Sequence, residues 1–346
     1  MKENIIIDNY KTLSDALLML NNIDSENLIL FVKSDNNQII GSITDGDIRR
    51  SLIRNNDLNQ LVGEVCNKNF VYLIESNDYV NLKKFSDREI KILPVLDKKK
   101  RFIKTIDLNK TRSILPLDCV IMAGGRGKRL SPLTDNIPKP MLKLGDKPII
   151  EYNIDRLISH GIKNINISIN YLGEHIEKYF GDGSKKNINI NYIKESKPLG
   201  TAGSLSLIKN LNYKNLLLLN GDLFTSINFE SLYQSLLKND AEIAIASTNY
   251  KVDIPYAILS EKNNIINKIE EKPSYNYFSN AGIYIINNEL ISKMPKNKFY
   301  NITEMIENVL SNGGIIVNDP IRGYWIDIGN PNDYKNAVEF VKYFKH

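Results

Sequence analysis

The chain has 346 residues, of which 42% are hydrophobic and 25% charged, and its formal net charge is +5. This length predicts two domains, and the composition is that of a soluble globular protein. The mild charge, without a basic stripe interleaved with aromatic residues, gives no support to nucleic-acid binding. No apolar run approaches the roughly 20 residues that span a bilayer, and the N-terminus lacks the apolar region of a signal peptide.

Cysteine and histidine usage excludes several kinds of site. Cys66 and Cys119 are too few for a disulfide framework and fit a reducing compartment, so we expect a cytoplasmic protein. The three histidines, His160, His175 and His346, are scattered along the chain and suggest neither a zinc site nor a catalytic triad.

The first hundred residues predict the same order of elements twice. A helix over residues 13–20, capped by Thr12 or Ser14, precedes strands at 28–32 and 39–43 and a helix at 45–54. The second copy predicts a helix at 78–85 and strands at 90–95 and 101–106. Such a repeat, of about 55–60 residues, indicates a paired module.

The segment LFVKSDNNQIIGSITDGDIRRSL, residues 30–52, resembles a CBS module, a paired α/β domain that commonly binds adenine nucleotides. The resemblance implies a CBS-pair domain over residues 1–112, a regulatory nucleotide whose ribose is held by Thr44 and Asp47, and a homo-oligomer formed through such pairs. The alternative is a plain helix N-cap at Thr44 or Asp45. In the second copy Lys104 replaces the glycine, so we expect at most one nucleotide site. Residues 109–116 read as a linker, because Pro116 disfavours helix before it.

The densest chemistry follows in VIMAGGRGKRLSPLTDNIPKPML, residues 120–142. A buried strand at 119–123 runs into three glycines that allow backbone N–H groups close to an anion, with cations beside them suited to a polyphosphate. A Walker A loop is excluded, because Met122 replaces its first glycine and Arg129 follows Lys128. A dinucleotide fingerprint is excluded because Leu130 occupies its small sixth position.

Alternating helices and strands continue at residues 149–159, 164–169, 174–180, 188–193, 201–211 and 216–219, which predicts an α/β fold with a largely parallel sheet. Ligands bind such sheets at the carboxyl ends of the strands. There the segment KPLGTAGS, residues 197–204, would let a flat base approach the backbone, with Thr201 and Ser204 able to cap the helix. Asp222 and Asp327 each follow a short apolar strand.

Gly-Gly-x-Gly-x-Arg-Leu-x-Pro-Leu-Thr followed by Pro-Lys-Pro is similar to the signature of the sugar-1-phosphate nucleotidylyltransferases, and this resemblance covers residues 117–346. It implies a Rossmann-like domain with a mainly parallel mixed sheet, and catalytic roles for Arg129, Lys139, Asp222 and Asp327, the two aspartates holding Mg²⁺. It also implies nucleotide contacts from Ala123, Gly124, Gly125, Gly127, Lys128, Arg129, Pro198, Gly200, Thr201 and Gly203. The implied sugar-phosphate contacts are Tyr256, Glu271, Lys272, Asn280 and Gly282.

A CBS pair ahead of this domain resembles the glucosamine-1-phosphate guanylyltransferases of legionaminic acid synthesis. That resemblance implies GTP and glucosamine 1-phosphate as substrates, and GDP-glucosamine and pyrophosphate as products. Mannose, glucose or a heptose 1-phosphate, with GTP or UTP, is the second enzyme hypothesis, since Ala257 stands where many relatives have glycine. The remaining hypotheses are a non-catalytic nucleotide-sugar sensor and a protein whose functional core is the CBS pair.

Overall fold

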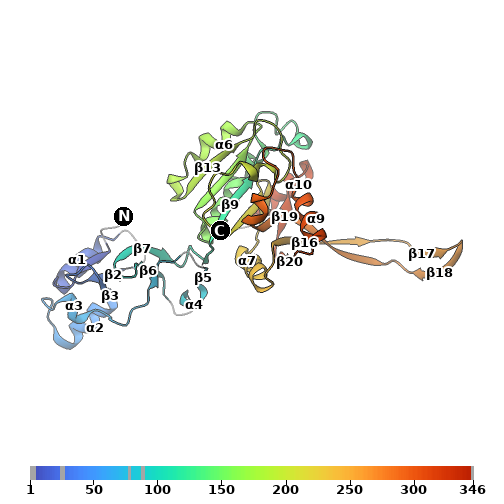
Figure 1. Cartoon of the computed structure of the whole chain (residues 1–346). Coiled ribbons are helices and arrows are strands. Elements are labelled where there is room, and N and C mark those ends of the chain that lie inside the picture. The colour runs from blue at the N-terminus through green and yellow to red at the C-terminus, as the bar shows by residue number, and fades with distance from the viewer. Residues whose placement is uncertain (1–4, 24–27, 77–78, 87–89, 344–346) are drawn as a thin grey trace. The chain divides into compact units, whose positions relative to one another are not determined.

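The computed structural model describes residues 5–23, 28–76, 79–86 and 90–343, and the chain divides into two compact units (Figure 1). Unit 1 spans Met1–Ile114 and unit 2 spans Leu115–His346. The division therefore falls inside the segment read as a linker from the sequence. Among the described residues, none of the helices combines the length and apolarity that a membrane crossing requires.

Unit 1 contains two three-stranded sheets with the same connectivity. In the orders β1-β2-β3 and β4-β6-β7, the first strand pairs in parallel with the second, which pairs antiparallel with the third. The repeat seen in the sequence thus recurs in the strand pairing. The strands are β1 Ile6–Asp8, β2 Ile29–Lys33, β3 Ile39–Thr44, β4 Leu73–Ile74, β5 Val80–Asn81, β6 Ile92–Leu96, β7 Phe102–Asp107 and β8 Ser113–Ile114.

The helices of unit 1 are α1 Leu13–Asn21, α2 Asp45–Asn55, α3 Val62–Val65 and α4 Lys83–Ser86. Helix α1 begins after Thr12, whose hydroxyl accepts from Asp15 N while the Asp15 carboxylate accepts from Thr12 N, a capping box. The helix predicted at 78–85 is wrong in extent. Strand β5 occupies part of that range, the Asn81 side chain starts the short α4 by accepting from Lys83 N, and Asp78 lies outside the described residues.

Unit 2 is built on a seven-stranded sheet in the order β13-β12-β9-β14-β19-β16-β20. Strands β13, β12, β9 and β14 are parallel, β19 runs antiparallel to both of its neighbours, and β20 is parallel to β16. The expected mixed α/β sheet is confirmed. Its strands are β9 Leu117–Met122, β12 Asn164–Ile169, β13 Asn189–Lys194, β14 Asn215–Asn220, β16 Ile243–Asp253, β19 Ser274–Asn287 and β20 Ile316–Pro320.

Shorter elements complete unit 2. Small two-stranded sheets pair β10 Lys143–Leu144 with β11 Lys147–Pro148, β15 Leu223–Thr225 with β21 Trp325–Asp327, and β17 Ile258–Lys262 with β18 Ile265–Glu270. The helices are α5 Ile149–Ser159, α6 Gly173–Phe180, α7 Phe229–Lys238, α8 Asn288–Ser292, α9 Ile302–Ser311 and α10 Pro331–Tyr343. Four 3₁₀ turns lie at η1 Lys128–Leu130, η2 Lys139–Met141, η3 Ser184–Lys186 and η4 Gly203–Leu207.

The centre of the sheet is strand β14, with the sequence NLLLLN. All four leucines are buried, and alternate side chains point to opposite faces of a strand. Leu216 and Leu218 pack in one apolar cluster with Met305 and Val309 of α9. From Asn215 to Leu219 the strand is buried, and only Asn220 at its carboxyl end is partly exposed, next to the loops that carry the sequence motifs.

The helix predicted at 201–211 is wrong, because only the 3₁₀ turn η4 forms there. The backbone N–H groups of Ala202 and Gly203 donate to the carbonyl of Tyr300, and a side chain at Gly203 would begin 2.5 Å from the Lys298 carbonyl oxygen. The segment is therefore tied to residues 298–302 and cannot wind into an α-helix.

Strands β16 and β19 extend beyond the other strands of the seven-stranded sheet. Pairing of β16 with β20 stops at Ser247, whereas its pairing with β19 continues from Thr248↔Ser279 to Asp253↔Ser274. Beyond that point the chain forms the β17–β18 hairpin. We call residues 248–279 the arm; it projects from the body of unit 2 (Figure 1).

Asp118, at the start of β9, is 1% exposed, and its carboxylate accepts from Asn212 N at 2.6 Å, Tyr213 N at 3.1 Å and Asn212 Nδ2 at 2.9 Å. Replacing Asp118 by alanine would remove the charged acceptor of three partly buried hydrogen bonds. We expect Asp118→Ala to lower the free energy of unfolding by about 2–3 kcal/mol. Urea unfolding followed by Trp325 emission reports on unit 2, because the chain has one tryptophan. Asp118→Asn, which keeps one acceptor oxygen, should lose less; equal stability of both variants and the wild type would contradict this role.

Candidate active site

Two carboxylates distant in sequence become neighbours through one short strand pair. Strands β15 and β21 are antiparallel with Leu223 opposite Asp327, and Ile328 N donates to the Asp222 carbonyl at 3.3 Å. Asp222 therefore lies beside Asp327 at the carboxyl end of β14. The return of the chain's last strand to its middle creates an acidic pair at the edge where α/β sheets bind ligands.

Lys139 is the cation between these acids. Its side chain is buried, its Nζ forms an ion pair with Asp222, and the same Nζ is 3.8 Å from Asp327 Oδ1. Pro138 directly precedes Lys139 and the 3₁₀ turn that begins there, and Pro140 directly follows Lys139 within that turn. The two prolines restrict the backbone on both sides of the lysine, so its direction toward the carboxylates is preset.

The glycine loop lies against the same lysine. Gly127 has φ +63°, and a side chain there would begin 3.1 Å from Lys139 Cβ. The Thr134 hydroxyl donates to the Gly127 carbonyl at 2.9 Å and fixes the loop. Ala123 N donates to the Ser168 carbonyl, which ties the end of β9 to β12, whereas Gly125 and Lys128 are exposed. The loop backbone between Gly125 and Lys128 is therefore open to an incoming anion.

Arg129 also faces the acidic pair. A side chain at Gly329 would begin 3.7 Å from Arg129 Nη2, so the guanidinium lies over the turn that follows Asp327. Burial, followed by the neighbouring charge of Asp222, raises the pKa of Asp327, while Lys139 and Arg129 act in the opposite direction. The two cations therefore only partly offset the cost of placing the carboxylates together.

The donor set of this pair fits Mg²⁺. Asp222 Oδ1 is buried and has no hydrogen-bond partner, which is costly for a carboxylate oxygen unless it binds a cation. Mg²⁺ prefers hard oxygens and commonly takes one or two carboxylates together with substrate phosphates and water. Within the described part of the chain, no cluster of three or more acids, histidines or cysteines offers an all-protein metal site.

An apolar cluster lies beneath the site and joins its parts. It contains Leu130 after the glycine loop, Phe224 of β15, Ile328 after β21, and residues of α10, and its buried members are Leu130, Leu142, Leu144, Ile149, Phe224, Ile328, Ala337 and Val341. Because these side chains come from segments as far apart as 130 and 341, packing in this cluster holds Arg129, Lys139, Asp222 and Asp327 in register.

The segment 197–204 reaches the same edge of the sheet. The Ser204 hydroxyl contacts Met122 Sδ at 3.4 Å, at the end of β9. Gly200 has φ +79° and fits closely against Tyr300, while Gly203 is buried and Pro198 exposed. The capping predicted for Thr201 is corrected, because its hydroxyl accepts from Ile302 N at 2.9 Å and thus holds the start of α9. Contacts of this segment with a nucleotide stay a prediction.

The predicted sugar-phosphate residues separate into two groups. Gly282 has φ +73° and a side chain there would begin 2.6 Å from Asn220 Nδ2, while Asn280 Oδ1 accepts from Gly282 N at 2.9 Å. These two residues therefore lie next to the turn that carries Asp222. The others, Tyr256, Glu271 and Lys272, are exposed residues of the arm, and the structure does not bring them to the acidic pair.

Sequence reasoning missed three residues that shape this site. Besides Thr134, these are Asn220, which contacts Gly282, and Asp333, whose carboxylate accepts from Gly329 N and Asn330 N at 3.2 Å each. Asn330 and Asp333 have the spacing of a capping box at the start of α10, a signal that the sequence does contain. Asn220 carries no comparable signal.

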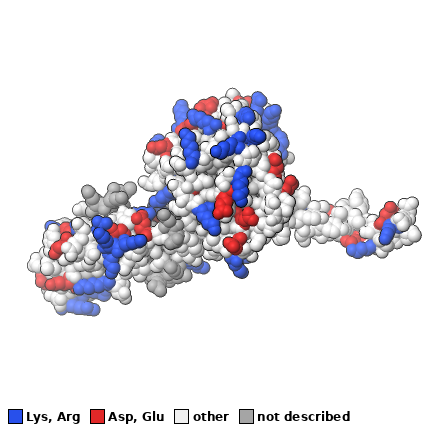
Figure 2. All heavy atoms as spheres, viewed as in Figure 1, with Lys and Arg blue, Asp and Glu red and all other residues white. Residues whose placement is uncertain are grey.

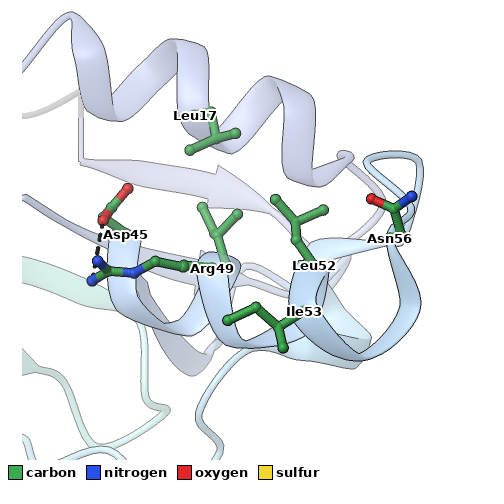
Figure 3. A pocket seen from close by; sticks show the side chains of 7 residues that line it. Leu17, Asp45, Arg49, Leu52, Ile53 and Asn56 are labelled. Carbon is green, nitrogen blue, oxygen red and sulfur yellow. Dashed lines mark ion pairs between the residues drawn. The ribbon is translucent and has the colours of Figure 1, made fainter.

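In unit 1, Thr44 and Asp47 form the capping box of α2. The Thr44 hydroxyl accepts from Asp47 N, Asp47 Oδ2 accepts from Thr44 N at 2.9 Å, and Arg50 donates to Asp47 Oδ1 at 2.6 Å. This is the N-cap that the sequence left open as the alternative, and a nucleotide there stays a prediction. An open groove between α1 and α2 (Figure 3) is lined by other residues: Leu17, Asp45, Ile48, Arg49, Leu52, Ile53 and Asn56.

Comparison with known proteins shows the family of unit 2. The sequence profile of the Nucleotidyl transferase family matches residues 118–343. A mannose-1-phosphate guanyltransferase of Yarrowia lipolytica is 31% identical over 230 residues, covering 63% of this chain and 62% of the relative. The bifunctional protein GlmU of Methanococcus maripaludis is 31% identical over 229 residues, covering 64% of this chain and 53% of the relative. The chain thus spans about half to two thirds of the length of these curated relatives.

The fold is also found in solved structures. A Bacillus anthracis protein assigned as a glucose-1-phosphate thymidylyltransferase, crystallised with sucrose, aligns with a TM-score of 0.53 at 22% identity. The alignment covers 66% of this chain and 97% of that protein. At this identity the likeness extends to the fold of unit 2.

The raised pKa of Asp327 leads to a prediction about stability. A carboxyl whose pKa is higher in the folded than in the unfolded state destabilises the fold once ionised, so the effect is absent below the ordinary pKa of about 4 and grows as the pH rises above it. We expect Asp327→Asn to unfold at a higher temperature than the wild type at pH 7, with the difference shrinking as the pH falls toward 4.

Thermal unfolding followed by circular dichroism measures this effect. Asp182→Asn is the matched control, because bonds from Ser184 lower the pKa of Asp182, so losing its charge should reduce stability at pH 7. A lower unfolding temperature for Asp327→Asn at pH 7 would contradict the stated electrostatics.

Proposed function

Because the chain belongs to the Nucleotidyl transferase family, we propose that unit 2 joins a nucleoside triphosphate to a sugar 1-phosphate, giving a nucleotide-diphosphate sugar and pyrophosphate. The observation that carries this proposal is the convergence of Lys139, Asp222 and Asp327 beside an open, cation-flanked glycine loop. A site built from two acids and two cations suits phosphoryl chemistry between bound substrates.

The reaction needs positioning more than acid–base chemistry. An oxygen of the sugar phosphate attacks the α-phosphorus, a new phosphorus–oxygen bond forms, and the bond to the pyrophosphate oxygen breaks in line. The attacking oxygen is already an anion at neutral pH, so no general base is required. Catalysis therefore depends on holding two polyanions in line and on neutralising their charge.

Different residues supply the positioning and the charge neutralisation. Arg129 and the backbone N–H groups of the glycine loop bind the β- and γ-phosphates and stabilise the departing pyrophosphate. Lys139 exchanges its carboxylate partner for phosphate oxygens as negative charge builds at the reacting centre. Asp222 and Asp327 would hold Mg²⁺, which when bound would supply positive charge that neutralises the substrate phosphates.

GTP and glucosamine 1-phosphate are the substrates we favour. Guanylyl transfer is supported by the name of the Yarrowia relative and by the sequence PLGTAG at residues 198–203. The sugar rests on the resemblance of the whole chain to glucosamine-1-phosphate guanylyltransferases, which also suggests a role in nonulosonic acid synthesis. Mannose 1-phosphate is the second candidate, since that relative is named for it.

In unit 1 we propose a regulatory adenine nucleotide at Thr44 and Asp47, supported by the resemblance of residues 30–52 to a CBS module. Both Asp47 oxygens already bond within α2, so binding would have to share or displace the contact from Arg50. The alternative is a purely structural CBS pair, in which the capping box of Thr44 and Asp47 only starts helix α2.

Pyrophosphate release, measured with Mg²⁺ across four nucleoside triphosphates and several sugar 1-phosphates, tests the activity. We expect release with GTP and glucosamine 1-phosphate, and a loss of about a hundredfold or more in rate for Lys139→Ala and for Asp222→Asn, because each removes a charge from the reacting centre. Lys143→Ala, an exposed lysine four residues away, is the control and should keep the wild-type rate.

The outcomes separate the candidate functions. Preference for UTP or CTP would overturn the guanylyl assignment, and preference for mannose 1-phosphate would replace the favoured sugar. No release with any pair would favour a nucleotide-sugar sensor, and near-normal turnover of Lys139→Ala would remove that residue from the chemistry.

Calorimetric titration of the full chain with AMP tests the site in unit 1, since AMP lacks the β- and γ-phosphates that the glycine loop would hold. We expect binding heat with the wild type and its loss in Asp47→Ala. Asp45→Ala, which removes the neighbouring acid paired with Arg49 at 3.7 Å, serves as control. Absence of heat with AMP and with ATP would leave Thr44 and Asp47 as a helix cap alone.

A further inference from the structure

The arm is a two-stranded ribbon, and no third strand of the described chain pairs with it. From Thr248↔Ser279 to Asp253↔Ser274 its pairing runs without a register shift, and the irregularity in β16 lies at the root, between Ile245 and Ser247. A bulge bends a strand and increases its twist. The direction of the ribbon is therefore set where it leaves the sheet, and it runs straight as far as Asp253 and Ser274, away from the body of its own unit (Figure 1). A further irregularity lies in its outer part, between Ser260 and Glu261.

The arm exposes an unusual amount of apolar surface. Eight large side chains on it are each more than half exposed: Tyr250, Tyr256, Leu259, Ile265, Ile266, Ile269, Tyr277 and Phe278. Figure 2 shows that the face in view is largely uncharged along the part nearer the body. Large exposed apolar surfaces mark interaction sites on folded proteins, and these eight side chains gather on one projecting element.

These side chains are arranged in cross-strand pairs. Tyr250 lies opposite Tyr277, and Leu259 lies opposite Ile269, so each pair shares one face of the ribbon. An isolated two-stranded hairpin is only marginally stable in water. If the eight side chains each hid about 100 Å² against a partner, they would bury about 800 Å² per copy, the size of a standard protein interface.

The arm also carries half of the expected sugar end of the site. Glu271 and Lys272 lie between β18 and β19, outward of Ser274, whereas Asn280 and Gly282 lie at the acidic pair. Six residues of extended strand separate Ser274 from Asn280, which at about 3.3 Å per residue is about 20 Å. Within one chain, the straight ribbon thus keeps Glu271 and Lys272 away from the carboxylates they are expected to serve.

We propose that the active site is completed in trans: in a symmetric dimer, the arm of each copy lies over the active site of the other. The partner subunit's Glu271 and Lys272 then reach the sugar 1-phosphate beside Asn280 and Gly282. This inference rests on the proposed function. A second copy of this chain is the occupant because the arm bears the motif that this chain's own site lacks, and a reciprocal exchange covers both apolar arms at once.

A mixed dimer tests the exchange directly. One copy carries Glu271→Ala with Lys272→Ala on the arm, the other carries Asp222→Asn in the body, and two different affinity tags isolate the heterodimer. Each homodimer should lose at least a hundredfold in pyrophosphate release. In the heterodimer one body of normal sequence receives a normal arm, so about half of the wild-type rate per dimer should return.

The matched control places the same residue types elsewhere on the arm. Glu261→Ala with Lys262→Ala changes a Glu-Lys pair on β17, and this variant should keep the wild-type rate. A heterodimer as inactive as its parents would overturn the inference, since the arm would then serve its own chain. Full activity of the Glu271→Ala, Lys272→Ala homodimer would overturn it as well, because the arm would not contribute to the site.

A measurement of mass separates this inference from the proposed function. Because Asp253 and Ser274 are direct neighbours across the ribbon, residues 254–273 can be replaced by the two-residue turn Asn-Gly. Sedimentation of the full chain should give a dimer for the wild type and a monomer for the shortened variant, whatever the activity assay shows. If the wild type releases no pyrophosphate but is a dimer, and the shortened variant is a monomer, only the proposed function is overturned. If the shortened variant has the same oligomeric state as the wild type, the exchange of arms is overturned.

Discussion

Two like charges, Asp222 and Asp327, lie side by side because a three-residue strand near the end of the chain pairs with a three-residue strand from its middle. Their repulsion and partial burial oppose folding, and Lys139 and Arg129 offset that cost only in part. The apolar cluster beneath them, from Leu130 to Val341, supplies the stabilisation that keeps the pair together. The order of elements in unit 2 follows from this requirement, since both ends of the unit must meet at the carboxyl end of β14.

Elements whose hydrophobic period is strong and whose partners are local could be predicted from the sequence. The helix at Ile149–Ser159 and the strand at Asn164–Ile169 form over the residues expected, and the glycine loop, Lys139, Asp222 and Asp327 converge as the motif implied. The motif works because its residues are adjacent to strand ends, and strand ends of a parallel sheet gather at one edge. The grouping of these residues at one edge of the sheet could therefore be predicted once the strands were placed.

Features that depend on distant backbone contacts could not be predicted. Threonine is a common N-cap residue, but the Thr201 hydroxyl accepts a hydrogen bond from Ile302 N, about a hundred residues later in the chain. A 3₁₀ turn therefore forms instead of the expected helix. The arm is the larger case. Residues 248–279 are not among the elements expected from the sequence, and whether such a hairpin folds over its own site or extends from it depends on where β20 stops pairing. That depends on tertiary structure and leaves no local signature.

If unit 2 has the proposed function, the separation between its body and the exposed arm affects how the chain could change its preference for a sugar. Gly282 cannot accept a side chain without displacing Asn220, and the proposed function requires both carboxylates, so the half of the site on the body of unit 2 is closed to variation. Exposed substitutions, by contrast, usually alter folding stability by less than about 0.5 kcal/mol. Residues on the arm around Glu271 can therefore change at little cost to stability, and sequence divergence among descendants of this chain should concentrate there while Arg129, Lys139 and the acidic pair stay constant.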